Sequence, residues 1–370
     1  MRLHVIGLPH TEVREQFLTC AYTMKVLKFG QMMTQAGFKV SIYAAGDSTE
    51  AVCDEYVPLL STAERLELFG AVADDPNGTW AHVTWDPADE PWQRMNRRAV
   101  EAISERAERG DLVLLTSGGA QRSVAEQLPH LVSCEPFVGY EGIVLPFCAF
   151  ESHAWRHYIY GKNGIVDGRW YDTVIPNYFN PADFHVENKQ KPEYLLYIGR
   201  LIYRKGILTA RQVAAAANIE LKVAGPGALS YKDRKLVTTD NCVLDDVDYL
   251  GPLGAKDRAT VMARATAVIA PTMYIEPFGG VTVEAMLSGT PAITTQWGVY
   301  PETVRDGVSG YRFDTLKSGV EAIEKAKALI PREIRQYAVE NYSTKALGPR
   351  FGAWFERLTG LYQEGWSSLT

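Results

Sequence analysis

The chain has 370 residues, of which 46% are hydrophobic and 22% are charged, and its formal net charge is −6. This length exceeds what one ordinary core requires and predicts two domains, while the composition is typical of a soluble globular protein and excludes a disordered one. The mildly acidic balance argues against a protein that coats nucleic acid by charge alone, although a local basic cleft is compatible with it.

The cysteines and the apolar runs restrict the compartment and the kinds of site. The five cysteines are scattered, lack C-x-x-C spacing, and predict reduced thiols with neither a disulfide framework nor a zinc site. The N-terminus enters a strand-like run without a signal peptide, and the longest apolar run, GIVLPFCAF, is far shorter than a membrane span. We therefore expect a cytoplasmic protein without a transmembrane segment. The cysteines are Cys20, Cys53, Cys134, Cys148 and Cys242.

In the first half of the chain, short runs rich in β-branched residues alternate with longer helical patterns. The expected strands cover 3–8, 39–46, 111–119 and 130–137, and the expected helices cover 17–35 and 94–110. The segment 47–93 is harder to interpret because Pro, Asp and Trp dominate its second half. The alternation favours a parallel sheet with helices on both faces.

Turn formers and a polar, lysine-containing linker at 173–194 mark a boundary, after which the alternation begins again. The expected strands then cover 194–200, 220–225, 267–272 and 291–295, and the expected helices cover 205–218, 255–265 and a stretch from Val281. We therefore predict an α/β fold of two doubly wound parallel-sheet (Rossmann-like) domains, 1–182 and 190–345, that face a cleft. An aromatic-rich amphipathic helix is expected at 351–365.

The stretch IEPFGGVTVEAMLSGTPA places two acids around a pair of glycines. Glu276 follows a predicted strand, and Gly279 and Gly280 allow backbone N–H groups to approach a ligand closely. The positive end of the helix that begins near Val281 favours a phosphate, and Glu284 is expected in the first turn of this helix. Carboxylates on both sides of a phosphate suit a sugar–diphosphate–nucleoside, which carries hydroxyls at both ends. The alternative is an acidic first turn that only stabilises the helix dipole.

Two cations follow the first strand of the second domain. Arg200 and Lys205 lie in LLYIGRLIYRKGI at the carboxyl end of that strand, where they would neutralise a diphosphate. Gly225, in VAGPGA, ends a further strand on the same edge of the sheet. The alternative is a solvated basic turn, which the independent phosphate loop in the same domain makes less favoured.

These motifs resemble those of the retaining glycosyltransferases of family 4, which have the GT-B architecture. The matching pieces are IGRLIYRKG, VAGPG, VDYLGPL, APTMYIEPFGGVTVEAMLSGTPAI and PETVRDGVSGYRF, and VIPNYF is similar to the signature that ends the family's first domain. The resemblance implies an acceptor-side domain at 1–182, a nucleotide-sugar donor domain at 190–345 and a C-terminal helix at 346–370 that crosses back to the first domain.

The resemblance also implies roles for individual residues. Arg200 and Lys205 hold the diphosphate, Glu276 with its neighbours holds the donor sugar, Glu284 takes the ribose, and the segment that ends at Leu253 flanks the base. The implied donor-binding residues are Arg200, Lys205, Gly225, Leu253, Glu276, Phe278, Gly279, Gly280, Val281 and Glu284.

The first half resembles the family weakly. His10 and Thr11 stand where the family has a glycine-rich loop, and we expect them on the acceptor side. Glu135 occupies a position where many members carry a histidine, so it is either a catalytic clamp on the donor sugar or the acceptor, or a satisfied structural carboxylate. His153 is a further acceptor-side candidate, although an isolated histidine is more often structural. Phrases such as EPFVGYEG and FESHAWRHYIYG are similar to those of phage and other viral glycosyltransferases.

We therefore predict a retaining glycosyltransferase that moves a sugar from a UDP- or GDP-sugar to a hydroxyl, with no further cofactor. Arg200, Lys205, Glu276 and Glu135 are its catalytic candidates. The acidic LDDVDY loop is interpreted as solvated and not as a metal site, because in this architecture Arg, Lys and a helix terminus neutralise the leaving diphosphate.

The acceptor stays open at this point. One candidate is a hydroxylated or hydroxymethylated base in phage DNA, and a lipid, a glycan or a small metabolite is equally compatible. The cations that would form a basic lip for DNA are Lys25, Lys28, Arg94, Arg97 and Arg98. Two alternative functions are a nucleotide-sugar epimerase of the same architecture and a catalytically silent nucleotide-sugar binding module.

Overall fold

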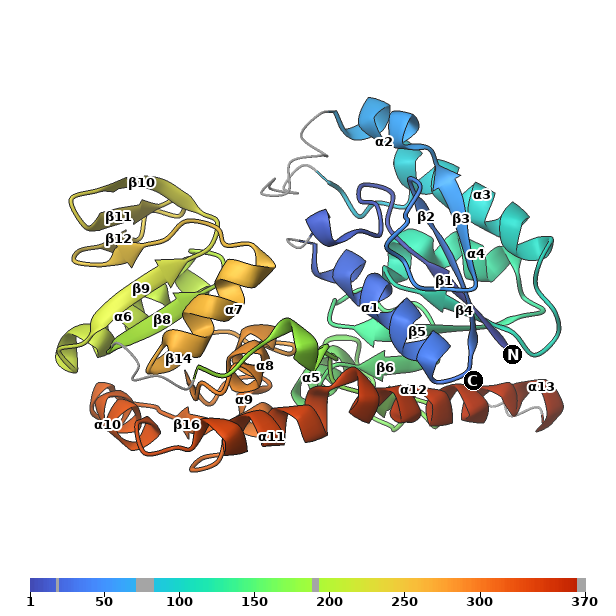
Figure 1. Ribbon diagram of the computed structural model, residues 1–370. Helices are drawn as coiled ribbons and strands as arrows, with labels where there is room; N and C mark the ends of the chain where they lie inside the picture. The colour runs from blue at the N-terminus through green and yellow to red at the C-terminus, as the bar shows by residue number, and fades with distance from the viewer. Residues whose placement is uncertain (18–19, 71–82, 188–192, 365–370) are drawn as a thin grey trace. The chain divides into compact units, whose positions relative to one another are not determined.

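The computed structural model describes residues 1–17, 20–70, 83–187 and 193–364 (Figure 1). The chain divides into two compact units, each built around its own parallel sheet. The N-terminal unit comprises residues 1–151, 159–178 and 347–370, and the C-terminal unit comprises residues 152–158 and 179–346. The predicted α/β fold with parallel sheets is confirmed in both units.

The N-terminal unit contains a seven-stranded sheet in the order β3-β2-β1-β4-β5-β6-β7, in which every pair of neighbours is parallel. The order reverses between β1 and β4, as in a doubly wound sheet. The strands are β1 (Arg2–Ile6), β2 (Lys39–Ala45), β3 (Glu55–Leu60), β4 (Leu112–Leu115), β5 (Val132–Val138), β6 (Cys148–Phe150) and β7 (Thr173–Val174). The expected strand at 111–119 is shorter than predicted, because a 3-10 turn, η4 (Gly118–Gln121), replaces its end.

The helices of this unit pack on the sheet through apolar faces. They are η1 (Glu15–Phe17), α1 (Ala21–Gln35), α2 (Thr62–Phe69), α3 (Glu90–Ser104), α4 (Arg122–Gln127), the part of α5 (His153–Lys162) from residue 159 onward, the part of α12 (Thr344–Thr359) from Leu347 onward, and α13 (Leu361–Glu364). A capping box starts α2, in which Ser61 and Glu64 satisfy each other's backbone N–H groups. This helix and β3 lie in the segment for which the sequence pattern gave no prediction.

The C-terminal helices complete the core of the N-terminal unit. From Leu347 onward, α12 belongs to this unit, and Phe351 and Phe355 pack edge-to-face against Phe29 of α1 at ring-centroid distances of 5.5 and 6.1 Å. The indole N–H of Trp354 donates to the carbonyl of Tyr171 at 2.7 Å. The helix expected at 351–365 therefore begins earlier, at Thr344, and breaks before α13, while residue 365 lies outside the described residues.

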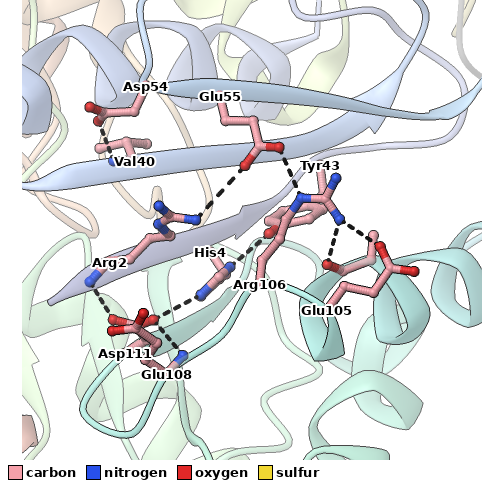
Figure 2. A network of polar contacts seen from close by, with 11 residues as sticks. Arg2, His4, Val40, Tyr43, Asp54, Glu55, Glu105, Arg106, Glu108 and Asp111 are labelled. Carbon is pink, nitrogen blue, oxygen red and sulfur yellow. Dashed lines mark hydrogen bonds and ion pairs between the residues drawn. The ribbon is translucent and has the colours of Figure 1, made fainter.

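A buried polar network ties the first strands of this sheet together (Figure 2). His4 of β1 is fully buried, and its ring nitrogens lie 2.8 Å from the Tyr43 hydroxyl and 3.4 Å from an Asp111 carboxylate oxygen. Asp111 also accepts from the backbone N–H groups of Arg2 and Glu108. Burial lowers the pKa of His4, and Asp111 opposes this shift. The network satisfies polar groups that would otherwise be buried without partners, so we assign it a structural role.

The C-terminal unit contains a six-stranded parallel sheet in the order β13-β9-β8-β14-β15-β16. The strands are β8 (Tyr194–Ile198), β9 (Glu220–Ala224), β13 (Asp248–Tyr249), β14 (Ala267–Ala270), β15 (Ala292–Thr294) and β16 (Gly310–Arg312). Its helices are η5 (Pro181–Asp183), η6 (Tyr203–Lys205), α6 (Ile207–Ala216), α7 (Ala255–Arg264), α8 (Gly280–Leu287), α9 (Tyr300–Thr303), α10 (Leu316–Ala326) and α11 (Pro331–Tyr342).

An antiparallel sheet that the sequence pattern did not predict interrupts this order. It consists of β10 (Ala228–Lys232), β11 (Lys235–Thr238) and β12 (Val243–Leu244), which come between β9 and β13 in the chain. Asp233 and Arg234 adopt positive φ angles at the turn between β10 and β11, as the tightest hairpin turns require.

Replacing Phe355 by Ala tests the packing of α12. This side chain is fully buried among aromatic rings, so we expect the change to lower the free energy of unfolding by about 3–5 kcal/mol. Urea unfolding followed by circular dichroism measures the loss, and Glu356→Ala, at an exposed position of the same helix, is the matched control. Equal effects of the two changes would show that α12 does not pack as described.

Candidate functional site

The candidate site lies where the strand order of the C-terminal sheet reverses. β8 and β14 are neighbours in this sheet, but the chain leaves β8 toward one edge and returns through β14 to build the other. In open α/β sheets, ligands bind outside the carboxyl ends of the strands at such a point. The two loops that begin there, after Ile198 and after Ala270, carry the residues that the sequence motifs singled out.

A glycine brings these two loops into contact. Gly206 follows η6 and has a φ of +77°, and a Cβ atom at this position would overlap the backbone carbonyl of Pro271. Any other residue would therefore force the loops apart. This close approach positions Lys205, the last residue of η6, beside the segment that follows β14.

Lys205 is the centre of a hydrogen-bonded cluster. Its ammonium group donates to a carboxylate oxygen of Glu276 at 2.6 Å and contacts the Tyr274 hydroxyl at 2.7 Å. Thr272 donates to the same Glu276 oxygen at 3.3 Å. Burial lowers the pKa of Lys205, and the charge and hydrogen bond of Glu276 oppose this shift. Burial and the nearby Glu276 also raise the pKa of Tyr274, which keeps its phenol neutral.

Thr272 and Tyr274 were not singled out from the sequence, yet a signal for them existed. Thr272, Tyr274 and Glu276 alternate in the segment after β14, and all three are buried or partly buried, which is a period-two pattern. Met273 and Ile275, on the other side of the segment, are 50% and 38% exposed.

Arg200 supplies a second cation, in the loop after β8. The Tyr197 hydroxyl donates to the Arg200 carbonyl at 2.9 Å and fixes the backbone of the loop. The Arg200 guanidinium is exposed, and within the residues that the structure describes it forms no ion pair. Its positive charge is therefore available to an anionic ligand.

The N-terminus of α8 points its free N–H groups into the same region. Gly279 precedes the helix with a φ of +68°, and a Cβ atom there would lie 2.7 Å from the Tyr300 ring. The first N–H groups of a helix have no intrahelical partner and attract anions. The helix begins at Gly280, one residue earlier than predicted, so Glu284 is its fifth residue. The expectation that Glu284 lies in the first turn is wrong, because Gly279 takes the left-handed conformation that starts the helix early.

Glu284 is held by a residue from another helix. Its Oε2 atom accepts a hydrogen bond from Nε of Arg258, on α7, at 2.6 Å, and a second contact from Nη2 of the same guanidinium. Residues Arg200, Lys205, Arg258, Glu276, Gly279 and Gly280 line one pocket of about 190 Å³. Its lining therefore combines three cationic side chains, one carboxylate and a helix N-terminus.

Several predicted donor-site residues have other roles in the structure. Phe278 is buried and stacks on Phe179 at 6.2 Å, so it packs in the core. A Cβ atom at Gly225 would overlap the carbonyl of Gly199, so Gly225 permits a close approach between two strand ends. Leu253 is partly buried and packs against a core cluster, and like Phe278 and Gly225 it is outside the lining of this pocket.

The structure gives Glu135 a structural role and does not support the predicted catalytic one. Its side chain is 0% exposed in β5. One carboxylate oxygen accepts from the backbone N–H groups of Val144 and Leu145, both at 2.7 Å, and the other accepts from the Tyr140 hydroxyl. Burial raises its pKa even though these hydrogen bonds oppose the shift. The carboxylate anchors the 140–145 loop and presents no oxygen to a ligand.

The predicted acceptor-side residues also differ in exposure. His10 is buried between the rings of Phe69 and Trp85, and the hydroxyl of Thr11 is hydrogen-bonded to that of Thr23. His153 is exposed on the first turn of α5. Of these three residues only His153 is exposed, and its Nδ1 lies 3.4 Å from a guanidinium nitrogen of Arg156.

The acidic loop that was interpreted as solvated carries three aspartates with cationic partners. Asp245, Asp246 and Asp248 pair with Lys235, Arg234 and Lys222 at 3.4, 2.8 and 2.6 Å.

All five cysteines are free thiols. Across the described ranges, no helix is long and apolar enough to cross a membrane.

The part of the chain that matches a known protein family also contains the pocket. Residues 180–343, which contain every residue of the pocket, match the family model described as "Glycosyl transferases group 1". Over these residues the chain is therefore similar to this family. Glycogen synthase from Mycobacterium tuberculosis is 35% identical over 160 residues, which are 40% of this chain and 34% of that protein. The chain spans between a third and a half of the length of the curated relatives it matches.

Solved structures extend the likeness to the whole fold. AviGT4, a glycosyltransferase involved in avilamycin A biosynthesis, has a TM-score of 0.68 at 20% identity, with 97% of this chain and 98% of that chain covered. Anabaena HepE, solved in complex with UDP-glucose, has a TM-score of 0.60 at 14% identity, with 96% of this chain and 100% of that chain covered. The fold is therefore of the GT-B type.

Replacing Gly279 by Ala tests the start of α8. We expect a larger loss of stability than in Gly307→Ala, because both glycines have left-handed φ angles, of +68° and +76°, but only Gly279 faces a ring within 3 Å. The shared conformational cost is about 1–2 kcal/mol, and the contact with Tyr300 adds to it. Urea unfolding of the two variants measures the difference. Equal losses would contradict the close packing of Gly279.

Proposed function

We propose that the protein is a retaining glycosyltransferase that moves a sugar from a nucleoside-diphosphate donor to a hydroxyl acceptor. The observation that carries this proposal is the pocket at the β8–β14 reversal, where Arg200, Lys205 and the N-terminus of α8 surround one small volume. Two cations and a helix N-terminus suit a group with two adjacent negative phosphates.

The diphosphate would lie against Arg200, Lys205 and the first N–H groups of α8. In this arrangement the charge that develops on the leaving group meets preorganised positive charge in a partly dehydrated pocket. Glu276 contacts Lys205 and Thr272 through Oε2, and its other carboxylate oxygen would accept hydrogen bonds from hydroxyls of the donor sugar. Glu284 would accept hydrogen bonds from the ribose.

Transfer would proceed on one face of the sugar. The bond between the anomeric carbon and the diphosphate oxygen breaks, and the acceptor hydroxyl oxygen forms its bond on the same face. The hydroxyl proton passes to the oxygen of the departing diphosphate. This route retains the anomeric configuration without a covalent nucleophile, and the buried position of Glu135 supports it by removing one carboxylate candidate. No metal ion is required by this scheme, since the two cations carry the charge balance.

The comparisons support a nucleotide-sugar donor. HepE was crystallised with UDP-glucose, and the curated relatives include proteins named glycogen synthase and D-inositol 3-phosphate glycosyltransferase. A UDP-sugar is therefore the first donor to test, and a GDP-sugar the second.

The structure does not favour DNA as the acceptor. Lys25 is paired with Glu151, Arg94 with Glu90, and Arg98 with both oxygens of Glu64, at 2.8 and 3.0 Å. Three of the five cations proposed for a basic lip are thus neutralised within the N-terminal unit. A neutral or small hydroxylated acceptor demands less free positive charge, so we propose this class in place of duplex DNA.

The donor site can be tested with Arg200→Ala. We expect turnover of the best donor to fall roughly 10²–10³-fold, because one electrostatic contact to the leaving group is lost, while the melting temperature stays close to that of the unchanged protein. Arg332→Ala, at an exposed position of α11, is the matched control. A thermal-shift screen with UDP, GDP and their sugars first identifies the donor, since a tight ligand raises the melting temperature.

Full turnover in Arg200→Ala would contradict the assignment of the diphosphate site. Release of an epimerised nucleotide sugar, with no free nucleoside diphosphate, would favour the epimerase alternative. Binding of a nucleotide sugar without any hydrolysis or transfer would favour the silent binding module.

The lowered pKa of Lys205 predicts a pH dependence of donor binding. Only the protonated ammonium attracts the diphosphate, so UDP affinity should fall as the pH rises through a value below that of an ordinary lysine. In Lys205→Arg the cation keeps its proton throughout, and the alkaline loss of affinity should disappear. Calorimetric titration with UDP from pH 7 upward measures both proteins, and their ratio cancels the ionisation of the base. Parallel pH profiles would exclude Lys205 as the titrating group.

A further inference from the structure

We propose that Arg258 positions the ribose-binding carboxylate of Glu284 and so makes the site selective for ribonucleoside diphosphates over their 2′-deoxy forms. This inference rests on the proposed function, because it concerns the nucleoside part of the same donor. Arg258 was not among the residues expected from the sequence. It lies outside the two sequence motifs from which the binding of the diphosphate and of the donor sugar was predicted.

The contact between the two side chains is monodentate on the carboxylate. Nε of Arg258 lies 2.6 Å from Oε2 of Glu284, and Nη2 of the same guanidinium contacts the same oxygen. The two lone pairs of Oε2 are thus directed at one guanidinium. Among the described residues, nothing donates a hydrogen bond to Oε1, so both of its lone pairs are free to accept.

Both residues stand on well-fixed helices. Arg258 is the fourth residue of α7, and its backbone N–H donates to Gly254 at 2.9 Å. The hydroxyl of Thr290, just after α8, donates to the carbonyl of Met262 in α7 at 2.7 Å. Glu284 lies on α8, and the N–H of Ser288 donates to its carbonyl at 3.0 Å. The two backbones therefore hold a fixed separation, and the ion pair sets the direction of the Glu284 side chain.

The position of Arg258 connects the ion pair to the ligand. Arg258 lines the same pocket as Arg200, Lys205 and the start of α8, where the diphosphate would lie. The ribose follows the diphosphate along the donor, so its hydroxyls come next to the carboxylate that Arg258 holds. An accepting Oε1 atom with two free lone pairs can receive both hydroxyls of a vicinal diol.

The ion pair also lowers the cost of binding the ribose. A partly exposed glutamate without a partner samples many rotamers, and ordering it on binding costs free energy. Arg258 is 32% exposed and Glu284 is 19% exposed in their side chains, so the pair is accessible to the ligand yet partly shielded from water. The guanidinium stays charged at any pH at which the protein is studied, and its planar fork fixes the geometry.

A purely structural link between α7 and α8 is the competing explanation. Such a link would change stability and affect all nucleotides alike. A positioning role instead predicts a change in the ratio of two dissociation constants, because only the ribo form gives both hydroxyls to Glu284. The ratio therefore separates the two explanations even if the variants lose some stability.

The experiment measures dissociation constants by calorimetry for UDP, 2′-deoxy-UDP, GDP and 2′-deoxy-GDP. The unchanged protein should prefer the ribo form of its nucleotide by roughly tenfold or more, as expected for a hydrogen bond to a charged acceptor. Arg258→Ala should reduce this preference several-fold, and Glu284→Gln should do the same. Combining the two changes should reduce the preference no further than Glu284→Gln alone. Arg258→Lys should give an intermediate ratio, because lysine restores the charge without the fork.

Arg264→Ala is the matched control, since Arg264 lies on the same helix and pairs with Glu187 at 3.7 Å. It should leave the ribo-to-deoxy ratio unchanged. A full ratio in Arg258→Ala would overturn the inference and leave Arg258 a structural residue. Equal binding of ribo and deoxy forms by the unchanged protein would overturn the ribose assignment of Glu284 and the inference with it, while the diphosphate site would stand. Binding of none of the four nucleotides would instead overturn the proposed function itself.

Discussion

The close approach of Gly206 to the carbonyl of Pro271 is the constraint on which the candidate site depends. β8 and β14 carry their loops in different directions from the point where the sheet reverses, and side chains would normally hold these loops apart. The missing Cβ atom lets η6 settle against the segment after β14, so that Lys205 reaches Glu276 within hydrogen-bond distance. Gly279 makes a similar approach to Tyr300 possible on the other side of the same segment. In doubly wound sheets, ligands bind at the point where the strand order reverses. Here the two glycines allow Lys205, Glu276 and the start of α8 to lie close together at that point.

The cationic side chains of the pocket differ in whether a carboxylate of the protein is paired with them. Lys205 is paired with Glu276, and Arg258 with Glu284, whereas Arg200 stands without an ion pair within the described part of the chain. Burial already disfavours the charged form of Lys205, and Glu276 compensates for part of this cost. An incoming diphosphate would add negative charge beside both free and paired cations. It would therefore gain most from Arg200 and the helix terminus, while Lys205 and Arg258 keep their carboxylates oriented toward the hydroxyls on either side.

The sequence allowed the fold to be predicted, and it also indicated that Arg200, Lys205 and Glu276 lie at one edge of a sheet, because strand–glycine–helix patterns report local backbone geometry. Arg200, Lys205 and Glu276 follow strands directly, and the side of the sheet on which they lie follows from chain direction alone. Arg258 could not be found in this way, since it is 26 residues from Glu284 in the chain and only the packing of α7 beside α8 brings them together. The sequence left a catalytic and a structural role open for Glu135 for a related reason: whether a strand residue faces a ligand or the core depends on the loops that cover it. Here the backbone N–H groups of Val144 and Leu145 enclose its carboxylate.

The size of the pocket explains how much of the function the site can specify. Its volume of about 190 Å³ is smaller than the roughly 300–1,000 Å³ that enclose most small-molecule ligands, so it would hold only the central part of a nucleotide sugar. That part, the diphosphate with the adjoining hydroxyls, is common to all such donors. In the proposed binding mode the base and the far side of the sugar would contact residues outside the pocket, where Met273 and Ile275 are exposed. Proteins with different substrates can therefore share the residues of this pocket. The family model described as "Glycosyl transferases group 1" accordingly matches residues 180–343, which contain every residue of the pocket.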